Sequence, residues 1–144
     1  MPLDHGWIEQ HIPHKGRMCL LEEVLSWDAA RIRCRSGSHR AADNPLRAHG
    51  RLGAACGIEY AAQAMAVHGA LVARSRGDTS VRQGRLVSLR EVMLAVAYVD
   101  DVGGRLDVHA EQLFADAAGA QYAFRVEQAG RVLASGRAAV IYVG

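Results

Sequence analysis

The chain has 144 residues, of which half are apolar and 22% are charged, a balance typical of one globular domain rather than of a disordered or fibrous protein. Its formal charge of +2 is too small to indicate nucleic-acid binding, which requires a strongly basic face. No run approaches the about 18 consecutive apolar residues of a membrane helix, and the start lacks the segments of a signal peptide, so we expect a cytoplasmic protein.

The first part of the chain predicts a lead-in followed by a hairpin. Residues 1–20 are expected to form a short helix or an irregular lead-in, because Pro13 removes a backbone donor and Gly16 interrupts the run. Residues 19–37 alternate apolar and polar side chains on both sides of a turn at Asp28. This alternation is typical of two adjacent strands.

One long helix is predicted from Gly53 to about Arg76. Apolar residues recur there with the 3.6-residue period of a helix face, and no proline interrupts the segment. Its many alanines and glycines allow another backbone to approach closely, which favours a helix wrapped by a sheet. Gly77 then ends the helix.

The remainder predicts a succession of strands, expected over residues 84–94, 105–115, 120–128 and 131–143. Gly119 and Gly130 stand at two of the breaks, where a hairpin turn needs a residue with positive φ. Strands on both sides of one helix indicate an α+β fold, in which an antiparallel sheet packs on that helix. No linker or repeat divides the chain, so residues 1–144 are predicted to form a single domain.

The predicted helix carries a carboxylate that needs an explanation. Glu59 and Gln63 are four residues apart, and therefore lie on one helix face in a stretch of small and apolar residues. Such surroundings tend to raise a carboxyl pKa and suit it to proton transfer. Alternatively, Glu59 lies at an exposed edge of the helix and has no chemical role.

Two segments carry a family resemblance. Residues 12–28, IPHKGRMCLLEEVLSWD, and residues 57–63, GIEYAAQ, resemble the opening and the helix motif of bacterial 3-hydroxyacyl-[acyl carrier protein] dehydratases. With Asn44 and Pro45 in the loop before the helix, the sequence is most similar to the divergent aryl-polyene-type dehydratases. The resemblance covers most of the chain through the order of its elements.

The resemblance implies a hotdog fold, in which an antiparallel sheet wraps around one central helix, and a dimer whose sites take residues from both subunits. It assigns Glu59 as the helix acid, which acts with a loop histidine to remove the C2 proton and to release the C3 hydroxyl as water. Amides at the helix start, Gly53 and Ala54, would bind the thioester oxygen. Gln63 would hold the carboxylate or a water.

The sequence departs from the family pattern at the loop histidine. The family's histidine lies fourteen residues before the acid, and that position holds Pro45, which cannot transfer a proton. His49 and His39 are the nearby candidates to replace it. The base has therefore moved to one of them or is absent.

Three functions remain open from the sequence. The first is a lyase that dehydrates a 3-hydroxyacyl thioester on acyl carrier protein, as in fatty-acid-like or polyene biosynthesis. The second is a degenerate hotdog subunit that pairs with a competent dehydratase, and the third is an acyl thioesterase, since one fold supports several functions. An acidic carrier protein would dock on the arginine-rich segment at Arg82, Arg85 and Arg90, which on charge alone is a solvated loop.

No metal and no cofactor are expected. The odd set of Cys19, Cys34 and Cys56 favours reduced, buried thiols over a disulfide framework. Structural or surface roles are predicted for His5, His11 and His14, which have no recognisable metal-ligand spacing. His68 and His109 are predicted to be packed or solvent-facing rather than catalytic.

Overall fold

The computed structural model describes residues 3–78 and 83–143. Its helices are α1 (His5–His11) and α2 (Gly57–Ser75), with short 3-10 turns η1 (Gly16–Met18), η2 (Ser38–Arg40) and η3 (Ala54–Cys56). Its strands are β1 (Glu23–Trp27), β2 (Arg31–Ser36), β3 (Gln83–Leu94), β4 (Leu106–Ala115), β5 (Gly119–Gln128) and β6 (Arg131–Val143). None of the helices in these residues is long and apolar enough to cross a membrane.

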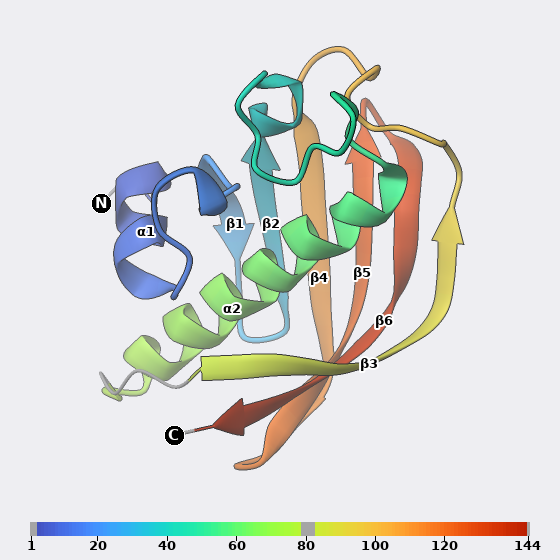
Figure 1. Cartoon of the computed structure of the whole chain (residues 1–144). Coiled ribbons are helices and arrows are strands. Elements are labelled where there is room, and N and C mark those ends of the chain that lie inside the picture. The colour runs from blue at the N-terminus through green and yellow to red at the C-terminus, as the bar shows by residue number, and fades with distance from the viewer. Residues whose placement is uncertain (1–2, 79–82, 144) are drawn as a thin grey trace.

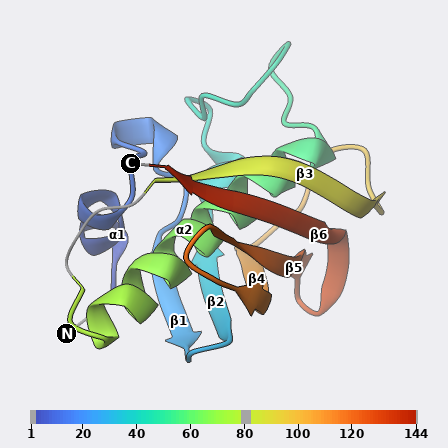
Figure 2. The ribbon, with the colours of Figure 1, turned by 90° about the horizontal axis from the view of Figure 1, so that it is seen from below.

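The strands form one antiparallel sheet that bends around α2. Their order is β1-β2-β4-β5-β6-β3, and every neighbouring pair is antiparallel. Two views at right angles show α2 lying in the hollow of the curved sheet (Figure 1, Figure 2). The α+β prediction is therefore confirmed, including the hairpin of β1 and β2 and the single long helix.

Helix α2 is buried because its small residues let the sheet approach. Tyr60, Ala64, Val67 and other residues of one helix face are buried in the core. At Gly57, an added Cβ would already stand 3.5 Å from side-chain atoms of β5 and β6. The alanines and glycines that suggested a wrapped helix thus allow the close packing seen here.

The two glycine-containing turns behave differently. Ala129 and Gly130, between β5 and β6, have φ values of 51° and 82°, as a tight hairpin requires. At Gly119 the prediction of a positive φ is wrong. An added Cβ there would lie 2.2 Å from the Val140 carbonyl oxygen, so glycine permits close contact between β5 and β6.

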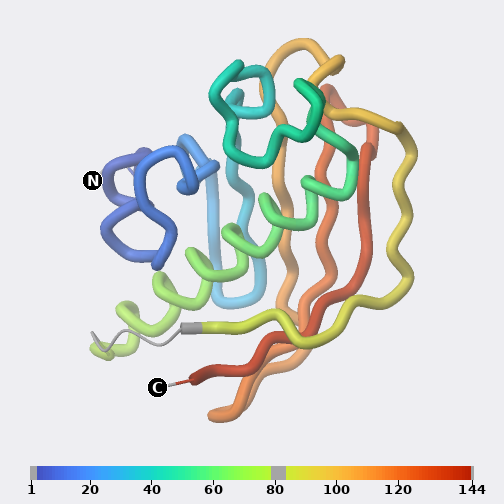
Figure 3. The backbone as a smooth tube through the Cα atoms, viewed as in Figure 1, coloured from blue at the N-terminus to red at the C-terminus, as the bar shows by residue number. Residues whose placement is uncertain are grey.

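The lead-in is fastened along the flank of α2. The side-chain oxygen of Gln63 accepts a hydrogen bond from the Leu20 amide at 2.8 Å, and its nitrogen donates to the Met18 carbonyl at 2.7 Å. The tube in Figure 3 shows this N-terminal segment folded back beside the helix. Gln63 therefore fixes the position of residues 12–20 relative to the first turns of α2.

Strand β3 lies at one edge of the sheet, and within residues 3–78 and 83–143 its strand partner is β6. Several of its large apolar side chains are exposed, and they are Leu86, Val87, Leu89, Val92, Met93 and Leu94. Met93 is 70% exposed. An apolar edge strand with one free side can add the strand of another chain.

Candidate functional site

The structure brings Glu59 together with a histidine that the sequence analysis did not select. Glu59 lies in the first turn of α2, and its Oε1 is 3.4 Å from Nε2 of His14. The two side chains are 41% and 27% exposed, so the pair lies at the surface of the chain but is partly covered. The prediction of a structural or surface role for His14 overlooked this contact, which joins segments that are distant in sequence.

Local contacts hold the loop that carries His14. Lys15 donates a hydrogen bond to the Ile12 carbonyl at 3.0 Å and another to the Glu9 carbonyl. The Glu9 carboxylate accepts from the Gly16 amide at 2.6 Å. The loop therefore closes on itself around His14, and Gln63 fastens its far end to α2.

The contact with His14 also controls the ionisation of Glu59. It lowers the pKa of Glu59 below the ordinary glutamate value and outweighs the opposite effect of partial burial. The expectation of a raised pKa was wrong, because the apolar helix supplies only part of the surroundings of this side chain. At neutral pH, Glu59 is a carboxylate.

The start of the helix offers fewer free amides than predicted. The Ala54 amide donates to the Ala97 carbonyl at 2.9 Å, which pairs the helix start with the segment after β3. Gly53 is the N-cap of η3 and bridges to Tyr98. The next residue, Ala55, is exposed and lies in the first turn, where amides have no partner within the helix. Ala55 is therefore better placed than Ala54 to receive an oxyanion.

Gln63 contacts the lead-in instead of Glu59. It is fully buried, and its oxygen and nitrogen both bond to the lead-in backbone. The expected role of Gln63 in holding the carboxylate or a water does not match these contacts. Its effect on the site is indirect, because it fixes the segment that presents His14.

The two loop histidines lie away from the Glu59 carboxylate within this chain. His39 is fully buried, and its ring Nε2 is 3.0 Å from the Val102 carbonyl; burial lowers its pKa. His49 is exposed at a loop position with φ of 53°. Among the described residues, His14 is the histidine within ion-pair distance of Glu59.

The loop before the helix has a structural anchor that the sequence did not reveal. Asn44 is buried and donates to the Tyr60 hydroxyl at 3.0 Å, and that hydroxyl also bonds to the Ser38 hydroxyl at 2.7 Å.

Arg47 holds the same loop by donating hydrogen bonds to the carbonyls of Ala41 and Gly50. Arg47 and Arg51 both pair with Asp100. These contacts hold the loop through side chains other than Pro45.

The proposed docking arginines are only partly described. Arg85 and Arg90 are exposed on β3 and pair in register with Ile141 and Arg137, while Arg82 lies outside the described residues. Within residues 3–78 and 83–143, no group of three or more His, Cys, Asp or Glu side chains could hold a metal ion.

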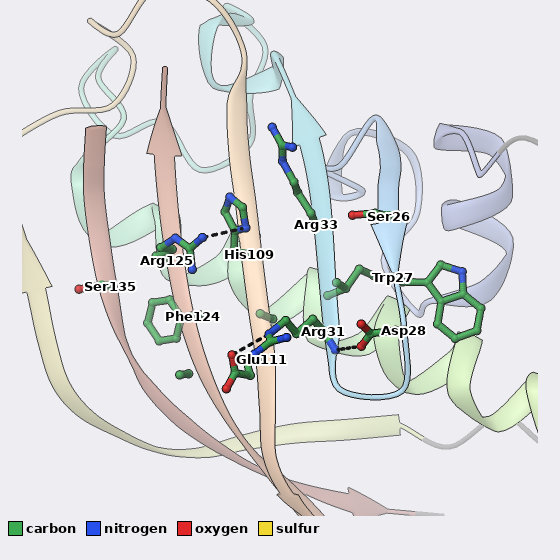
Figure 4. Close-up of a pocket in the computed structure, with 13 residues that line it drawn as sticks. Ser26, Trp27, Asp28, Arg31, Arg33, His109, Glu111, Phe124, Arg125 and Ser135 are labelled. Carbon is green, nitrogen blue, oxygen red and sulfur yellow. Dashed lines mark hydrogen bonds and ion pairs between the residues drawn. The ribbon is translucent and has the colours of Figure 1, made fainter. Parts of the chain in front are cut away.

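A hollow of about 540 Å³ lies on the outer face of the sheet, away from α2 (Figure 4). Several charged residues that line it have ion-pair partners: Arg31 pairs with Glu111, Arg33 with Asp107, and Arg125 and His109 with Glu127. A second hollow of about 370 Å³ lies between the segment after β3 and the β5–β6 turn. Neither is lined by Glu59 or His14.

Solved structures share this fold. The dehydratase heterocomplex ApeI:P from Xenorhabdus doucetiae is similar over 95% of this chain and 91% of that chain, with 24% identity and a TM-score of 0.83. A thioesterase from Haemophilus influenzae has 8% identity over 85% of this chain and 78% of its own, with a TM-score of 0.61. A mutant thioesterase from Pseudomonas aeruginosa has 14% identity over 84% and 80%, with a TM-score of 0.58. These likenesses confirm the hotdog fold.

The family follows from sequence comparison. Comparison with curated protein sequences finds no match. The sequence model of the ApeP-like family, described as ApeP dehydratase, matches residues 7–143, from helix α1 to the end of β6. The match includes the lead-in and the helix motif that carried the resemblance. The chain belongs to the ApeP-like dehydratase family.

Proposed function

We propose that the chain dehydrates a 3-hydroxyacyl thioester on acyl carrier protein to the trans-2-enoyl thioester. The observation that carries this proposal is Glu59, a partly covered carboxylate in the first turn of the central helix of a dehydratase-family chain. Its contact with His14 keeps it ionised and therefore able to accept a proton.

The reaction needs a base for the C2 proton, a donor to the thioester oxygen and a proton for the leaving hydroxyl. Glu59 takes the proton from C2 of the acyl chain, while an amide donor stabilises the negative charge that develops on the thioester oxygen. The amide of Ala55 at the helix start suits that role. The C3 hydroxyl then takes a proton and leaves as water, and the double bond forms between C2 and C3.

We further infer that the site is completed by a second hotdog subunit joined along β3, either a second copy or a different chain. Three observations support this pairing. Among the described residues the outer edge of β3 has no strand partner, its apolar side chains are exposed, and Glu59 lines neither of the two hollows described above. The similar structure from Xenorhabdus doucetiae is described as a dehydratase heterocomplex, which favours a non-identical partner.

Arg85 and Arg90, with Arg82, are proposed to receive the acidic carrier protein or the phosphate of its prosthetic arm. Guanidinium groups bind phosphate through paired hydrogen bonds, and charges at the rim act mainly on association rate. Replacing Arg85 and Arg90 by serine should weaken carrier binding and flatten its dependence on salt. Arg131→Ser, at an exposed position of β6, is the matched control. An unchanged salt slope would remove these arginines from the docking surface.

Mass spectrometry of a 3-hydroxyacyl carrier protein tests the function directly. Incubation with the chain, alone or with an orthodox dehydratase subunit, should remove the mass of one water from the carrier. Glu59→Gln should slow this loss about 100-fold or more, the scale of a general acid or base. Glu111→Gln, on the outer face of the sheet, should not.

Other products would point to the alternatives. Release of free carrier protein would indicate thioester hydrolysis, the activity named for two of the similar structures. Dehydration that occurs only with the partner, and at full rate with Glu59→Gln, would indicate a supporting subunit without its own chemistry.

A further inference from the structure

We propose that His14 is a positioning residue that keeps Glu59 ionised and oriented, so that the Glu59 carboxylate carries both proton transfers of the dehydration. This inference rests on the proposed function and adds a division of roles within the site. It begins from the contact of 3.4 Å between His14 Nε2 and Glu59 Oε1.

One ring nitrogen of His14 faces the carboxylate and the other is enclosed. Its Nδ1 is buried and has no hydrogen-bond partner among the described residues. A hydrogen on Nδ1 would be a buried donor without an acceptor, which is costly. A hydrogen on Nε2 instead faces the carboxylate. Hydrogen bonds at catalytic sites are often long without substrate and shorten when it binds.

The other charged groups near Glu59 bind elsewhere, so His14 is the group that faces the Glu59 carboxylate. In the lead-in, Lys15 bonds to backbone carbonyls and Glu9 accepts from the Gly16 amide. At the N-cap of α2, Cys56 is half-buried, and burial, together with the negative charge of Glu59, raises its thiol pKa. Glu59 is thus flanked by an imidazole and a protonated thiol, neither of which competes with it for a substrate proton.

One carboxylate can complete the elimination. Glu59 takes the C2 proton, and the electron pair of the C2–H bond becomes the C2–C3 double bond as the C3–O bond breaks. The resulting carboxylic acid gives the same proton to the departing hydroxyl, so water leaves and the carboxylate is restored. No histidine changes its protonation state, which makes proline at position 45 compatible with turnover.

Two substitutions separate positioning from proton transfer. His14→Gln retains an N–H that can face Glu59 but cannot shuttle protons, and His14→Ala removes the contact. We expect activity within about threefold of the wild type for His14→Gln and a loss of about 10- to 100-fold for His14→Ala. His109→Gln is the matched control, since His109 pairs with Glu127 at 3.0 Å on the outer face of the sheet.

Two further readouts go beyond activity. Carbon-13 NMR of the glutamate carboxyls should show a Glu59 pKa below the ordinary glutamate value in the wild type, His14→Gln and His109→Gln. In His14→Ala the Glu59 pKa should be higher than in the wild type. The pH profile of kcat/KM should rise through the pKa of Glu59 and then stay flat, and the rise should move to higher pH in His14→Ala. If His14 had only a structural role, its replacement would not shift the pH at which kcat/KM rises.

Each opposing result has its own meaning. A His14→Gln variant as slow as His14→Ala, or a profile that falls again on the basic side, shows that a second titrating group transfers a proton and overturns the single-carboxylate step. A Glu59 pKa that is unchanged in His14→Ala overturns the positioning role, whatever the turnover. Absence of dehydration by the wild type, with or without a partner subunit, overturns the proposed function and the proton steps built on it.

Discussion

The Nδ1 atom of His68 lies 2.8 Å from the hydroxyl oxygen of Tyr122, in the buried layer between α2 and β5. The other ring nitrogen lies 2.9 Å from the Asp28 carbonyl in the β1–β2 turn. A neutral ring satisfies both contacts, since Nδ1 accepts from the hydroxyl and Nε2 donates to the carbonyl. Burial lowers the pKa of His68, because the charged ring would lose its solvation.

The buried histidines predict a loss of stability in mild acid. Burial also lowers the pKa values of His39 and His109, so the unfolded chain binds more protons than the folded one below about pH 6.5. The free energy of unfolding is therefore highest above that pH, and it falls as the pH drops through the lowered pKa values of the folded-state histidines. Urea unfolding from about pH 7 to about pH 5 should show this slope, and His68→Gln should flatten it. His49→Gln, at an exposed loop position, is the control; a slope equally flattened there would refute the assignment.

Gln63 should contribute to stability through the lead-in. Gln63→Leu fills a similar volume but leaves the Leu20 amide and the Met18 carbonyl without their partner. Each buried group left unsatisfied costs about 1 to 3 kcal/mol. Gln121→Leu, at an exposed position of β5, should change the free energy of unfolding by less than about 0.5 kcal/mol. Equal effects of the two variants would show that the lead-in is not held by Gln63.

Gly119 should not tolerate alanine. The added Cβ would overlap the Val140 carbonyl oxygen, so β5 and β6 must separate locally. Such strain costs about 1 to 3 kcal/mol and should lower the thermal midpoint. Gly103→Ala is the control, because nothing lies within 4 Å of the added carbon there. A Gly119→Ala chain as stable as this control would contradict the close approach.

The fold was predictable because its signals are local. Alternation in the strands and the 3.6-residue period of α2 each depend on neighbouring residues, and both gave the observed elements. Gly119 shows where prediction from local sequence fails. A glycine at the start of a strand is equally compatible with a turn and with close contact to another strand. The difference depends on Val140, which only the folded sheet brings near.

The site was less predictable because it depends on contacts between distant segments. Glu59 stood out as a charge in an apolar helix, but nothing local in the lead-in indicates that His14 reaches it. The hydrogen bond from the Ala54 amide to the Ala97 carbonyl likewise forms only because the segment after β3 lies beside the start of the helix. The direction of the Glu59 pKa followed from the missed contact, not from the helix composition.

The exposed edge of β3 should control association. Val87→Lys and Met93→Lys place charges on the apolar edge strand and should weaken binding of a second subunit. Sedimentation velocity of the chain, alone and with a dehydratase subunit, measures this directly. Leu113→Lys, on the exposed end of β4, is the matched control. Association unaffected by both β3 variants would move the interface elsewhere.

The loop before α2 is anchored by residues on both sides of position 45. Asn44 and Arg47 hold this loop through contacts with Tyr60 and Asp100. Its shape therefore does not depend on a histidine at position 45. Proline at a compatible position stabilises a protein by about 0.4 to 1 kcal/mol, because it restricts the unfolded chain. Pro45 therefore restricts the unfolded loop, while the imidazole beside Glu59 comes from the lead-in.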